Sequence, residues 1–290
     1  MASSRPTRLL SVDYEDWHQL VRRRVGASNW REPGPALARE TDAMLALFDE
    51  LHARATFFVL GMAARAHPEL LDRIVAAGHE IGCHGDAHLP VHAQTPDDFA
   101  ADLRAAKATI EDLTGRTPVG YRAPAFSITA SSKDWAYRVL AEEGFTYDAS
   151  QHDSPALRER AAPTTTGPHR LDGDGALWEF PIAVWHAGPA RLPVGGASYW
   201  QGLPTPVILR GLTEAGPFAG LYLHPNELDP DPLRARLPTG ATPAQRAHAK
   251  LREAQRNGAR RRAPAVLKAI AQRFELIPYG EAHARLDRCA

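Results

Sequence analysis

Short apolar runs alternate along the chain with longer amphipathic stretches, and polar loops separate the two. The short runs are β-branched or aromatic and end at Gly, Pro or charged residues, which is typical of buried strands. We expect strands at 9–12, 55–60, 79–83, 118–121, 144–148, 177–184 and 218–223. The amphipathic stretches have the spacing of one-sided helices. We expect helices at 36–51, 68–77, 95–113, 132–143, 244–256 and 265–273.

The recurring order of strand, polar loop and helix indicates a parallel sheet with right-handed crossovers. An α/β barrel and an open sheet both fit this order, and 290 residues fit one large domain or two small ones. Long polar segments near 18–35, 154–175 and 189–206 are expected to be loop insertions, which often shape substrate entry when they lie at the site end of a sheet.

Composition excludes several classes of protein. A hydrophobic content of 44% and a charged content of 23% are those of a globular protein, and a formal net charge of zero argues against general nucleic-acid binding. An apolar run of 18 residues is absent, so we expect no membrane span. Two distant cysteines and an N-terminus without an apolar core favour a reducing compartment, and we expect a cytoplasmic protein.

Three carboxylates follow the first expected strand within four residues. Asp13, Glu15 and Asp16 stand where the apolar run ends. Carboxylates this close repel one another unless a cation or a proton lies between them, and α/β folds build their sites at the carboxyl ends of parallel strands. A metal site is one interpretation, and a solvated acidic turn or helix start is the other.

His84 and His88 follow the third expected strand, four residues apart. On a helical turn this spacing places both imidazoles on one face, where they can bind one metal ion. An accidental pair is the alternative in a chain with 13 histidines. The metal interpretation is favoured because the pair and the acids both follow strands. Two imidazoles and one carboxylate around a metal with an open position form a hydrolytic arrangement.

Four motifs along the chain resemble, in the same order, those of the polysaccharide deacetylases, carbohydrate esterase family 4. They are Asp13 with its neighbouring acids, His84-x-x-x-His88, Arg122-x-Pro124 and Leu223-His224. Segments 12–19, 192–200 and 222–230 further resemble the branch associated with exosortase and exopolysaccharide loci. The resemblance spans about residues 8–280 and implies a single domain over 1–290, a distorted (β/α) barrel of about seven strands.

The resemblance implies a role for each motif residue. Asp13 would be the general base and His224 the general acid. Arg122 would pair with Asp13. Pro124 would shape a loop whose backbone N–H near Ala125 helps to hold the oxyanion.

The resemblance also implies that His84, His88 and one carboxylate hold a divalent metal ion. In the commonest family pattern the base and the metal-binding acid are adjacent, whereas here a tyrosine follows Asp13. Strand alternation puts Glu15 on the face of Asp13, but a chain that has already turned would present Asp16. Both carboxylates therefore remain candidate ligands.

The implied reaction is removal of an N-acetyl group from an N-acetylglucosamine-type amino sugar, with release of acetate. A metal, zinc ahead of cobalt, nickel or manganese, would polarise the amide and activate water, while a base and an acid move the protons. The alternative is a relative of the same fold that acts on a non-sugar C–N bond such as a cyclic ureide, with or without metal. A binding protein without catalysis is disfavoured because the motif residues remain. We expect a small, lipid-linked or nucleotide-linked substrate, and the oligomeric state is open.

Aromatic side chains near the expected loops are candidates for stacking on a sugar. They are Trp17, Trp30, Trp185, Tyr199 and Trp200. Tyr199 and Trp200 are favoured because Gly195 and Gly196 beside them allow a close backbone approach. Asp148, an acid at the end of its strand, is expected to orient the site.

Overall fold

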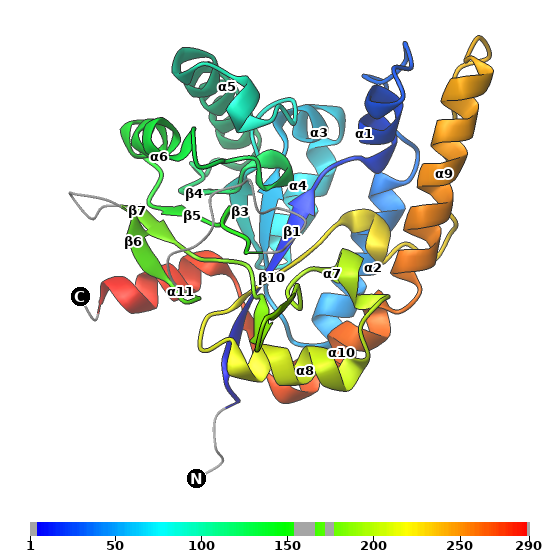
Figure 1. Ribbon diagram of the computed structural model, residues 1–290. Helices are drawn as coiled ribbons and strands as arrows, with labels where there is room; N and C mark the ends of the chain where they lie inside the picture. The colour runs from blue at the N-terminus through cyan, green and yellow to red at the C-terminus, as the bar shows by residue number, and fades with distance from the viewer. Residues whose placement is uncertain (1–4, 154–165, 172–176, 289–290) are drawn as a thin grey trace.

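A curled, mainly parallel sheet forms the centre of the molecule (Figure 1). The computed structural model describes residues 5–153, 166–171 and 177–288. The parallel strands are β1 (Thr7–Tyr14), β2 (Thr56–Val59), β3 (Glu80–Cys83), β4 (Gly120–Tyr121), β5 (Tyr147–Asp148), β7 (Leu177–Glu179) and β10 (Gly220–Leu223). They follow the order β10-β1-β2-β3-β4-β5-β7, which is the distorted seven-stranded barrel expected from the sequence.

The barrel closes through single bridges rather than through a full ladder. Ile182, beyond the end of β7, bridges to Gly220, and Gly196 bridges to Tyr222. Gly195 permits this approach, because a Cβ there would lie 2.5 Å from the backbone oxygen of Gly220. The two ends of the sheet therefore meet at β10.

Four further strands lie outside this set of seven. They are β6 (His169–Leu171), β8 (Trp185–Ala187), β9 (Ala190–Leu192) and β11 (Glu275–Ile277). β6 runs antiparallel to β7, and β8 and β9 form a separate hairpin. β11 runs parallel to the first half of β1, so β1 has three partner strands: β10, β2 and β11.

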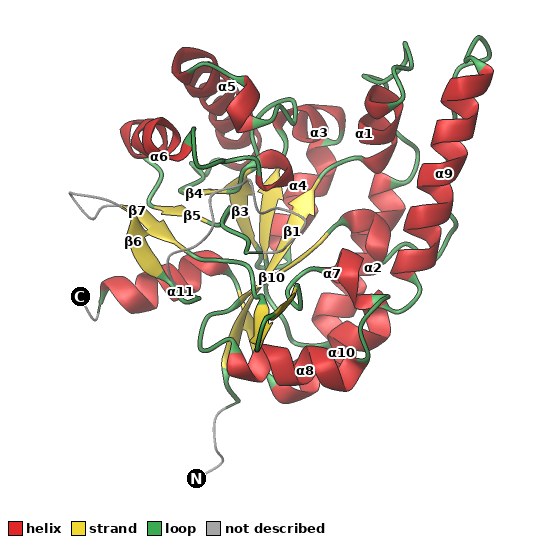
Figure 2. Ribbon diagram, viewed as in Figure 1, coloured by secondary structure: helices red, strands yellow, loops and turns green. Residues whose placement is uncertain are grey.

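Helices cover the outside of the sheet (Figure 2). They are α1 (Trp17–Arg24), α2 (Leu37–Glu50), α3 (Gly61–Ala66), α4 (Pro68–Ala76), α5 (Pro96–Thr114), α6 (Lys133–Glu142), α7 (Ala197–Trp200), α8 (Thr205–Glu214), α9 (Pro243–Arg260), α10 (Ala263–Arg273) and α11 (Tyr279–Asp287). The helix expected at 95–113 is present as α5, where the Thr95 side chain caps the first turn and Gly115, at φ 66°, ends the helix. In the described part of the chain, no helix has both the length and the apolar character needed to cross a membrane.

Strand β1 separates two cores by the alternation of its side chains. Leu10 and Val12 point outward into the main core, where they join residues of the surrounding helices such as Phe48. Leu9 points inward and packs with Phe58 and other aromatic residues of the barrel. The inner positions that follow Leu9 along β1 are polar, and they lead to the carboxyl end of the sheet.

Inward-facing glycines make room for the aromatic residues inside the barrel. A Cβ on Gly82 would lie 2.7 Å from the Phe58 ring, and one on Gly120 would lie 2.0 Å from Tyr147. Large and small side chains therefore alternate between neighbouring strands, and the lower barrel is filled rather than open.

The three segments expected to be loops contain regular structure. Residues 17–24 form α1, because Trp17, Val21 and Val25 recur every four residues and bury one face. The segment 189–206 holds β9, α7 and the start of α8, and β6 lies within 154–175. The rest of that last segment lies outside the described residues, apart from 166–168. Helices α3 and α11 were also missed. Helix α3 begins at Gly61, directly after the strand expected at 55–60.

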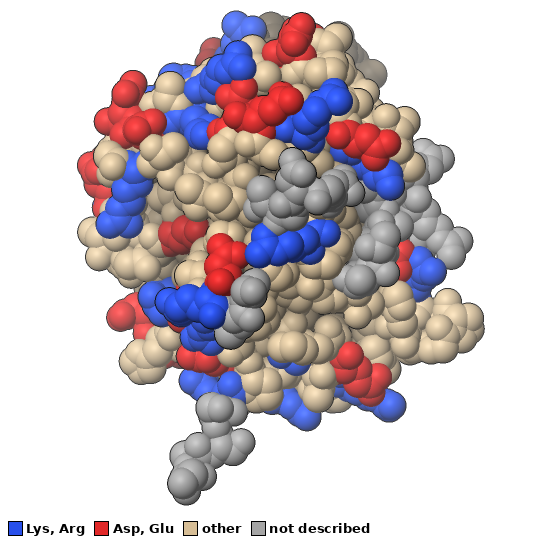
Figure 3. Space-filling view, turned by 90° about the vertical axis from the view of Figure 1, so that its left-hand side faces the viewer, with Lys and Arg blue, Asp and Glu red and all other residues tan. Residues whose placement is uncertain are grey.

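Most charged side chains of the described residues are at least partly exposed. On the face that carries α5, α6 and α11, basic and acidic side chains are interspersed (Figure 3). This distribution agrees with the formal net charge of zero.

Candidate active site

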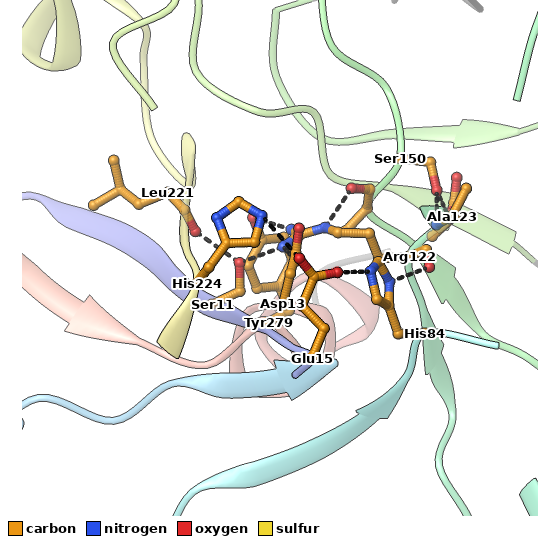
Figure 4. Close-up of polar contacts among 12 residues, drawn as sticks. Ser11, Asp13, Glu15, His84, Arg122, Ala123, Ser150, Leu221, His224 and Tyr279 are labelled. Atoms are coloured by element: carbon orange, nitrogen blue, oxygen red, sulfur yellow. Dashed lines mark hydrogen bonds and ion pairs between the residues drawn. The ribbon is translucent and has the colours of Figure 1, made fainter. Parts of the chain in front are cut away.

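A buried ion pair forms the floor of the candidate site. Nη1 of Arg122 donates to Oδ1 of Asp13 at 2.7 Å and to the Ser11 hydroxyl at 2.6 Å (Figure 4). Nη2 donates to the hydroxyl of Tyr279 at 3.0 Å, and Nε donates to the Ala149 carbonyl at 2.9 Å. The pair between Arg122 and Asp13 expected from the resemblance is therefore present. Arg122 is fully buried, so these bonds fix both its guanidinium plane and the carboxylate of Asp13.

Glu15, His84 and His88 converge above this floor. Oε2 of Glu15 lies 3.0 Å from Nε2 of His88 and 3.8 Å from Nε2 of His84. One ligand atom from each residue lies within 4.8 Å of the others, and this is the one such group among the described His, Cys, Asp and Glu residues. The three side chains come from the ends of β1 and β3 and from the loop after β3.

The protonation states in this cluster suit a divalent cation. Burial opposes ionisation of Glu15, but the neighbouring imidazoles of His88, His224 and His84 outweigh it and lower the pKa of Glu15 to about 2. Burial lowers the pKa of His84 to about 4. Near neutral pH the carboxylate is therefore ionised and the His84 imidazole is neutral, which are the forms that bind metals.

The tautomer of His84 is fixed by its second nitrogen. Nδ1 of His84 lies 2.8 Å from the backbone oxygen of Arg122. A carbonyl oxygen accepts only, so Nδ1 carries the proton and the lone pair of Nε2 faces Glu15. A backbone partner of this kind is the usual support of a metal-binding histidine. The donor set therefore fits a metal ion.

The two histidines meet through a loop and not through a helical turn. Gly85 and His88 have φ angles of 78° and 54°, so the chain folds back between the histidines, and the ring centroids are 5.5 Å apart. Gly85 is required there, since a Cβ would lie 2.6 Å from a carboxylate oxygen of Asp102. That oxygen also accepts the backbone N–H of Asp86 at 3.0 Å. The expectation of a helical turn was wrong, although the two imidazoles do converge.

Asp16 lies outside the cluster. Its carboxylate caps α1 by accepting the backbone N–H of His18 at 2.8 Å, and it also accepts the backbone N–H of Gly34. The alternation of β1 continues as far as Glu15, so Glu15 shares the inner face with Asp13. The structure thus brings one of the two candidate carboxylates to the histidines and assigns the other to helix capping.

His224 approaches the cluster from β10. Its Nε2 lies 3.7 Å from Oε1 of Glu15, and its Nδ1 lies 3.4 Å from Oε2 of Glu227. Burial opposes the positive charge, but Glu227 outweighs it and raises the pKa of His224. Glu227 was not among the residues predicted from the sequence. A signal was available, because His224-Pro225 followed by an acid three residues after the histidine has the form of a capping box.

The loop after β4 carries the expected oxyanion position. Pro124–Phe126 forms a tight turn in which Ala125 and Phe126 both have φ 53°, a left-handed conformation. Ser150 supports the turn by accepting the N–H of Ala123 at 2.8 Å and donating to Asp148 at 2.6 Å. Asp148 therefore reaches this loop through Ser150.

Asp148 also forms a buried carboxyl pair with Glu179. Burial raises the pKa of both groups, and the charge of Asp148 raises that of Glu179 further, well above its usual range. A proton shared between the two carboxyl groups would relieve the repulsion between them. One oxygen of Glu179 accepts the backbone N–H of Gln151 at 2.9 Å.

Trp200 is not available to a substrate. It is 1% exposed, belongs to the main core, and donates from Nε1 to the backbone oxygen of Val194 at 2.8 Å. The prediction of Trp200 as a sugar contact was wrong. Trp17 is likewise buried, in the core between α1 and α9. Tyr199 is partly exposed and packs beside Tyr222, whose ring centroid lies 5.8 Å from that of His224.

The chain matches two family models, one after the other. Residues 32–144 match the polysaccharide deacetylase model, and residues 149–277 match a domain of unknown function (DUF3473). The first match contains the two histidines and Arg122, the second contains His224, and β1 precedes both. Residues 32–144, less than half of the chain, are therefore similar to a polysaccharide deacetylase domain.

Curated relatives agree with the first of these matches. A peptidoglycan deacetylase of Helicobacter pylori is 36% identical over 37% of this chain and 35% of its own length. A chitin deacetylase of Cryptococcus neoformans is 30% identical over 29% of this chain and 18% of its own length. The chain spans well under half the length of these relatives.

A solved structure matches almost the whole chain. It is a "putative polysaccharide deacetylase" from Mycobacterium smegmatis, which is 20% identical, has a TM-score of 0.60, and is matched over 99% of this chain and 96% of its own. At this identity the likeness shows the fold. The curled parallel sheet thus has the fold of that solved structure.

Proposed function

We propose that this protein is a metal-dependent N-deacetylase that removes the acetyl group from an N-acetylglucosamine-type amino sugar and releases acetate. The observation that carries the proposal is the cluster of Glu15, His84 and His88, in which the neutral tautomer of His84 points its lone pair at the carboxylate. The names of the relatives support the reaction, because they are peptidoglycan and chitin deacetylases.

The cluster would hold a divalent cation, with zinc as the expected ion and cobalt, nickel or manganese as alternatives. A cation there would supply a Lewis acid for the amide carbonyl. Imidazole and carboxylate ligands suit these metals. Asp16 remains a capping residue in this proposal.

Asp13 acts as the general base. Arg122 holds one of its oxygens, so the carboxylate stays oriented within the site. Asp13 takes a proton from the attacking water as the oxygen of that water bonds to the acetyl carbon. The loop of Pro124–Phe126 would present the backbone N–H of Ala125 to the developing oxyanion.

His224 acts as the general acid. An amine is a poor leaving group unless its nitrogen is protonated, and His224 delivers that proton as the C–N bond breaks. Glu227 keeps the imidazole charged before the transfer. The products are acetate and the free amino sugar. Tyr199, at the rim beside Tyr222, would contact the sugar.

Acetate release tests the proposal directly. The protein is incubated with chito-oligosaccharides, peptidoglycan fragments, and nucleotide-linked or lipid-linked N-acetylglucosamine, first after chelation and then with each metal restored. We expect acetate only with metal present, and none from the Glu15→Gln variant. Equal release after complete chelation would contradict metal dependence. Cleavage of a cyclic ureide without acetate release from any amino sugar would favour the alternative activity.

A further inference from the structure

Helices α1 and α9 lie side by side at one edge of the candidate site (Figure 1). Trp17 and Val21 of α1 pack in one apolar cluster with Ala249 of α9. Arg23 ties the end of α1 to the loop of the metal-binding histidines, because its Nη1 donates to the backbone oxygen of Ala87 at 2.6 Å. The C-terminal turn of α1 therefore stands next to the proposed metal ligands.

Three arginines lie on these two neighbouring helices. Arg24 ends α1, and Arg252 and Arg256 lie four residues apart on one face of α9. Partial burial and the positive charges of Arg252 and Arg256 lower the pKa of Arg24, whereas the charge of Glu15 acts in the opposite direction. Arg24 therefore lies within electrostatic reach of both α9 arginines and of the carboxylate at the centre of the site.

The helix dipole explains only part of this arrangement. Basic residues are favourable in the last turn of a helix, and Arg22 and Arg23 of that turn donate to backbone carbonyls. Arg24 makes no such bond, because no side chain or carbonyl in the described residues accepts a hydrogen bond from its guanidinium. No hydrogen-bond acceptor among the described residues therefore offsets the repulsion between Arg24 and the two arginines of α9.

The two arginines of α9 differ in their partners: Arg252 has no carboxylate partner among the described residues, whereas Arg256 shares the carboxylate of Glu227 with His224. The guanidinium of Arg252 donates to Oε1 of Gln255 at 3.1 Å and to Nε2 of His248 at 3.3 Å. Arg256 donates to Ser198 at 2.8 Å and lies 3.6 Å from Glu227, a carboxylate already engaged by His224. Positive charge is therefore in excess at the rim of the site.

We propose that Arg24, Arg252 and Arg256 form a subsite for an oxyanion group of the substrate, a phosphate or a carboxylate, next to the N-acetylated sugar. Guanidinium groups bind both groups through paired hydrogen bonds, and their mutual repulsion is relieved when an anion lies between them. The inference rests on the proposed function and narrows its substrate class to acidic amino sugars.

Equilibrium binding tests this subsite without catalysis. Calorimetry compares N-acetylglucosamine 1-phosphate with N-acetylglucosamine, and a glucuronate-containing disaccharide of N-acetylglucosamine with N,N′-diacetylchitobiose. We expect the anionic member of at least one pair to bind about tenfold more tightly, with a preference that shrinks at high salt. The pair that shows the preference identifies phosphate or carboxylate as the group recognised.

The Arg24→Gln, Arg252→Gln double variant should lose this preference. The matched control is Lys250→Gln, because Lys250 lies on the opposite face of α9 and pairs with Glu253 at 2.8 Å. A thermal unfolding curve establishes that the double variant is folded. Equal affinity for charged and neutral ligands, or a preference that survives in the double variant, would overturn the subsite.

Acetate release measured in parallel separates the two proposals. A binding preference that depends on the arginines, without acetate release from any ligand, leaves the subsite standing and overturns the deacetylase. Acetate release with equal kcat/KM for charged and neutral substrates supports the deacetylase and overturns the subsite.

Discussion

Glu227 holds His224 at two points. Oε2 of Glu227 lies 3.4 Å from Nδ1 of His224 and accepts the backbone N–H of the same residue at 2.8 Å. A single carboxylate therefore sets both the position of the chain and the charge of the ring. The protonated state of the proposed general acid depends on this contact.

Replacing Glu227 with Gln should move the alkaline limb of the pH–rate profile to lower pH. Glu227 raises the pKa of His224, so its neutralisation lowers that pKa, and His224 loses its proton at a lower pH. We expect kcat for amide substrates at neutral pH to fall by about tenfold or more. The measurement is kcat against pH for both proteins.

The control for this change is Glu214→Gln, which removes an exposed carboxylate paired with Arg210 on α8. Its profile should match that of the wild type. An alkaline limb that stays in place in Glu227→Gln would show that Glu227 only positions the chain.

His224→Ala should reduce amide hydrolysis far more than hydrolysis of activated aryl acetates. General acid catalysis contributes about 100- to 10,000-fold when the leaving group must be protonated, and a phenolate leaves without a proton. The ratio of kcat/KM for the two substrate types should therefore change by at least about 100-fold. Equal losses on both would make His224 a binding or structural residue.

Glu15→Gln and Asp16→Asn should differ sharply in metal content. Glu15 lies between the imidazoles, whereas Asp16 caps α1. Removing a residue that only supports a metal ligand typically lowers metal affinity by about 10- to 100-fold. We therefore expect Glu15→Gln to lower metal affinity by more than this range and Asp16→Asn to lower it by less. Elemental analysis after dialysis measures the content, with the His84→Ala, His88→Ala double variant as the metal-free reference. Stoichiometric metal in Glu15→Gln would show that the Glu15 carboxylate is not a metal ligand.

His79 should make the protein less stable in mild acid. Its Nδ1 accepts the backbone N–H of Ala55 at 3.2 Å, and burial lowers its pKa to about 4. The unfolded chain, with a pKa near 6.5, then binds more protons than the folded one between about pH 6.5 and 4, so the free energy of unfolding falls as pH is lowered through this range.

Urea unfolding from pH 7 to pH 5 measures this slope. His79→Gln should flatten it, whereas His52→Gln, at an exposed position, should leave it unchanged. An unchanged slope in His79→Gln would assign the acid sensitivity to other groups.

The alternation of β1 placed Glu15 on the face of Asp13, but it left Asp16 open as a ligand, because the sequence did not show where the strand ends and the chain turns. The pair of His84 and His88 was also visible, although its helical explanation was wrong. A left-handed φ at His88 depends on packing against the neighbouring loop, and spacing alone does not encode it. Local patterns thus identified the residues better than they identified the path of the chain.

The glycines before Tyr199 show why other expectations failed. Gly195 and Gly196 do permit a close approach, but the partner is β10 rather than a ligand, and Trp200 turns into the core. The full set of hydrogen-bond partners of Arg122 could not be predicted from the sequence either. Its partner in β1 lies 109 residues earlier, and Tyr279 lies 157 residues later, so these contacts exist only in the folded chain.

The third partner of β1 bears on the order in which the molecule forms. β11 pairs with the start of β1, and the side chains of Thr7 and Glu275 meet across 268 residues of sequence. During synthesis Asp13 and Arg122 leave the ribosome long before Tyr279. The guanidinium of Arg122 therefore lacks the Tyr279 hydroxyl as a partner until the end of synthesis. Contacts this distant in sequence slow folding, because the intervening chain must lose much of its freedom first. We therefore expect the contact between Arg122 and Tyr279 to form only after β11 has paired with β1.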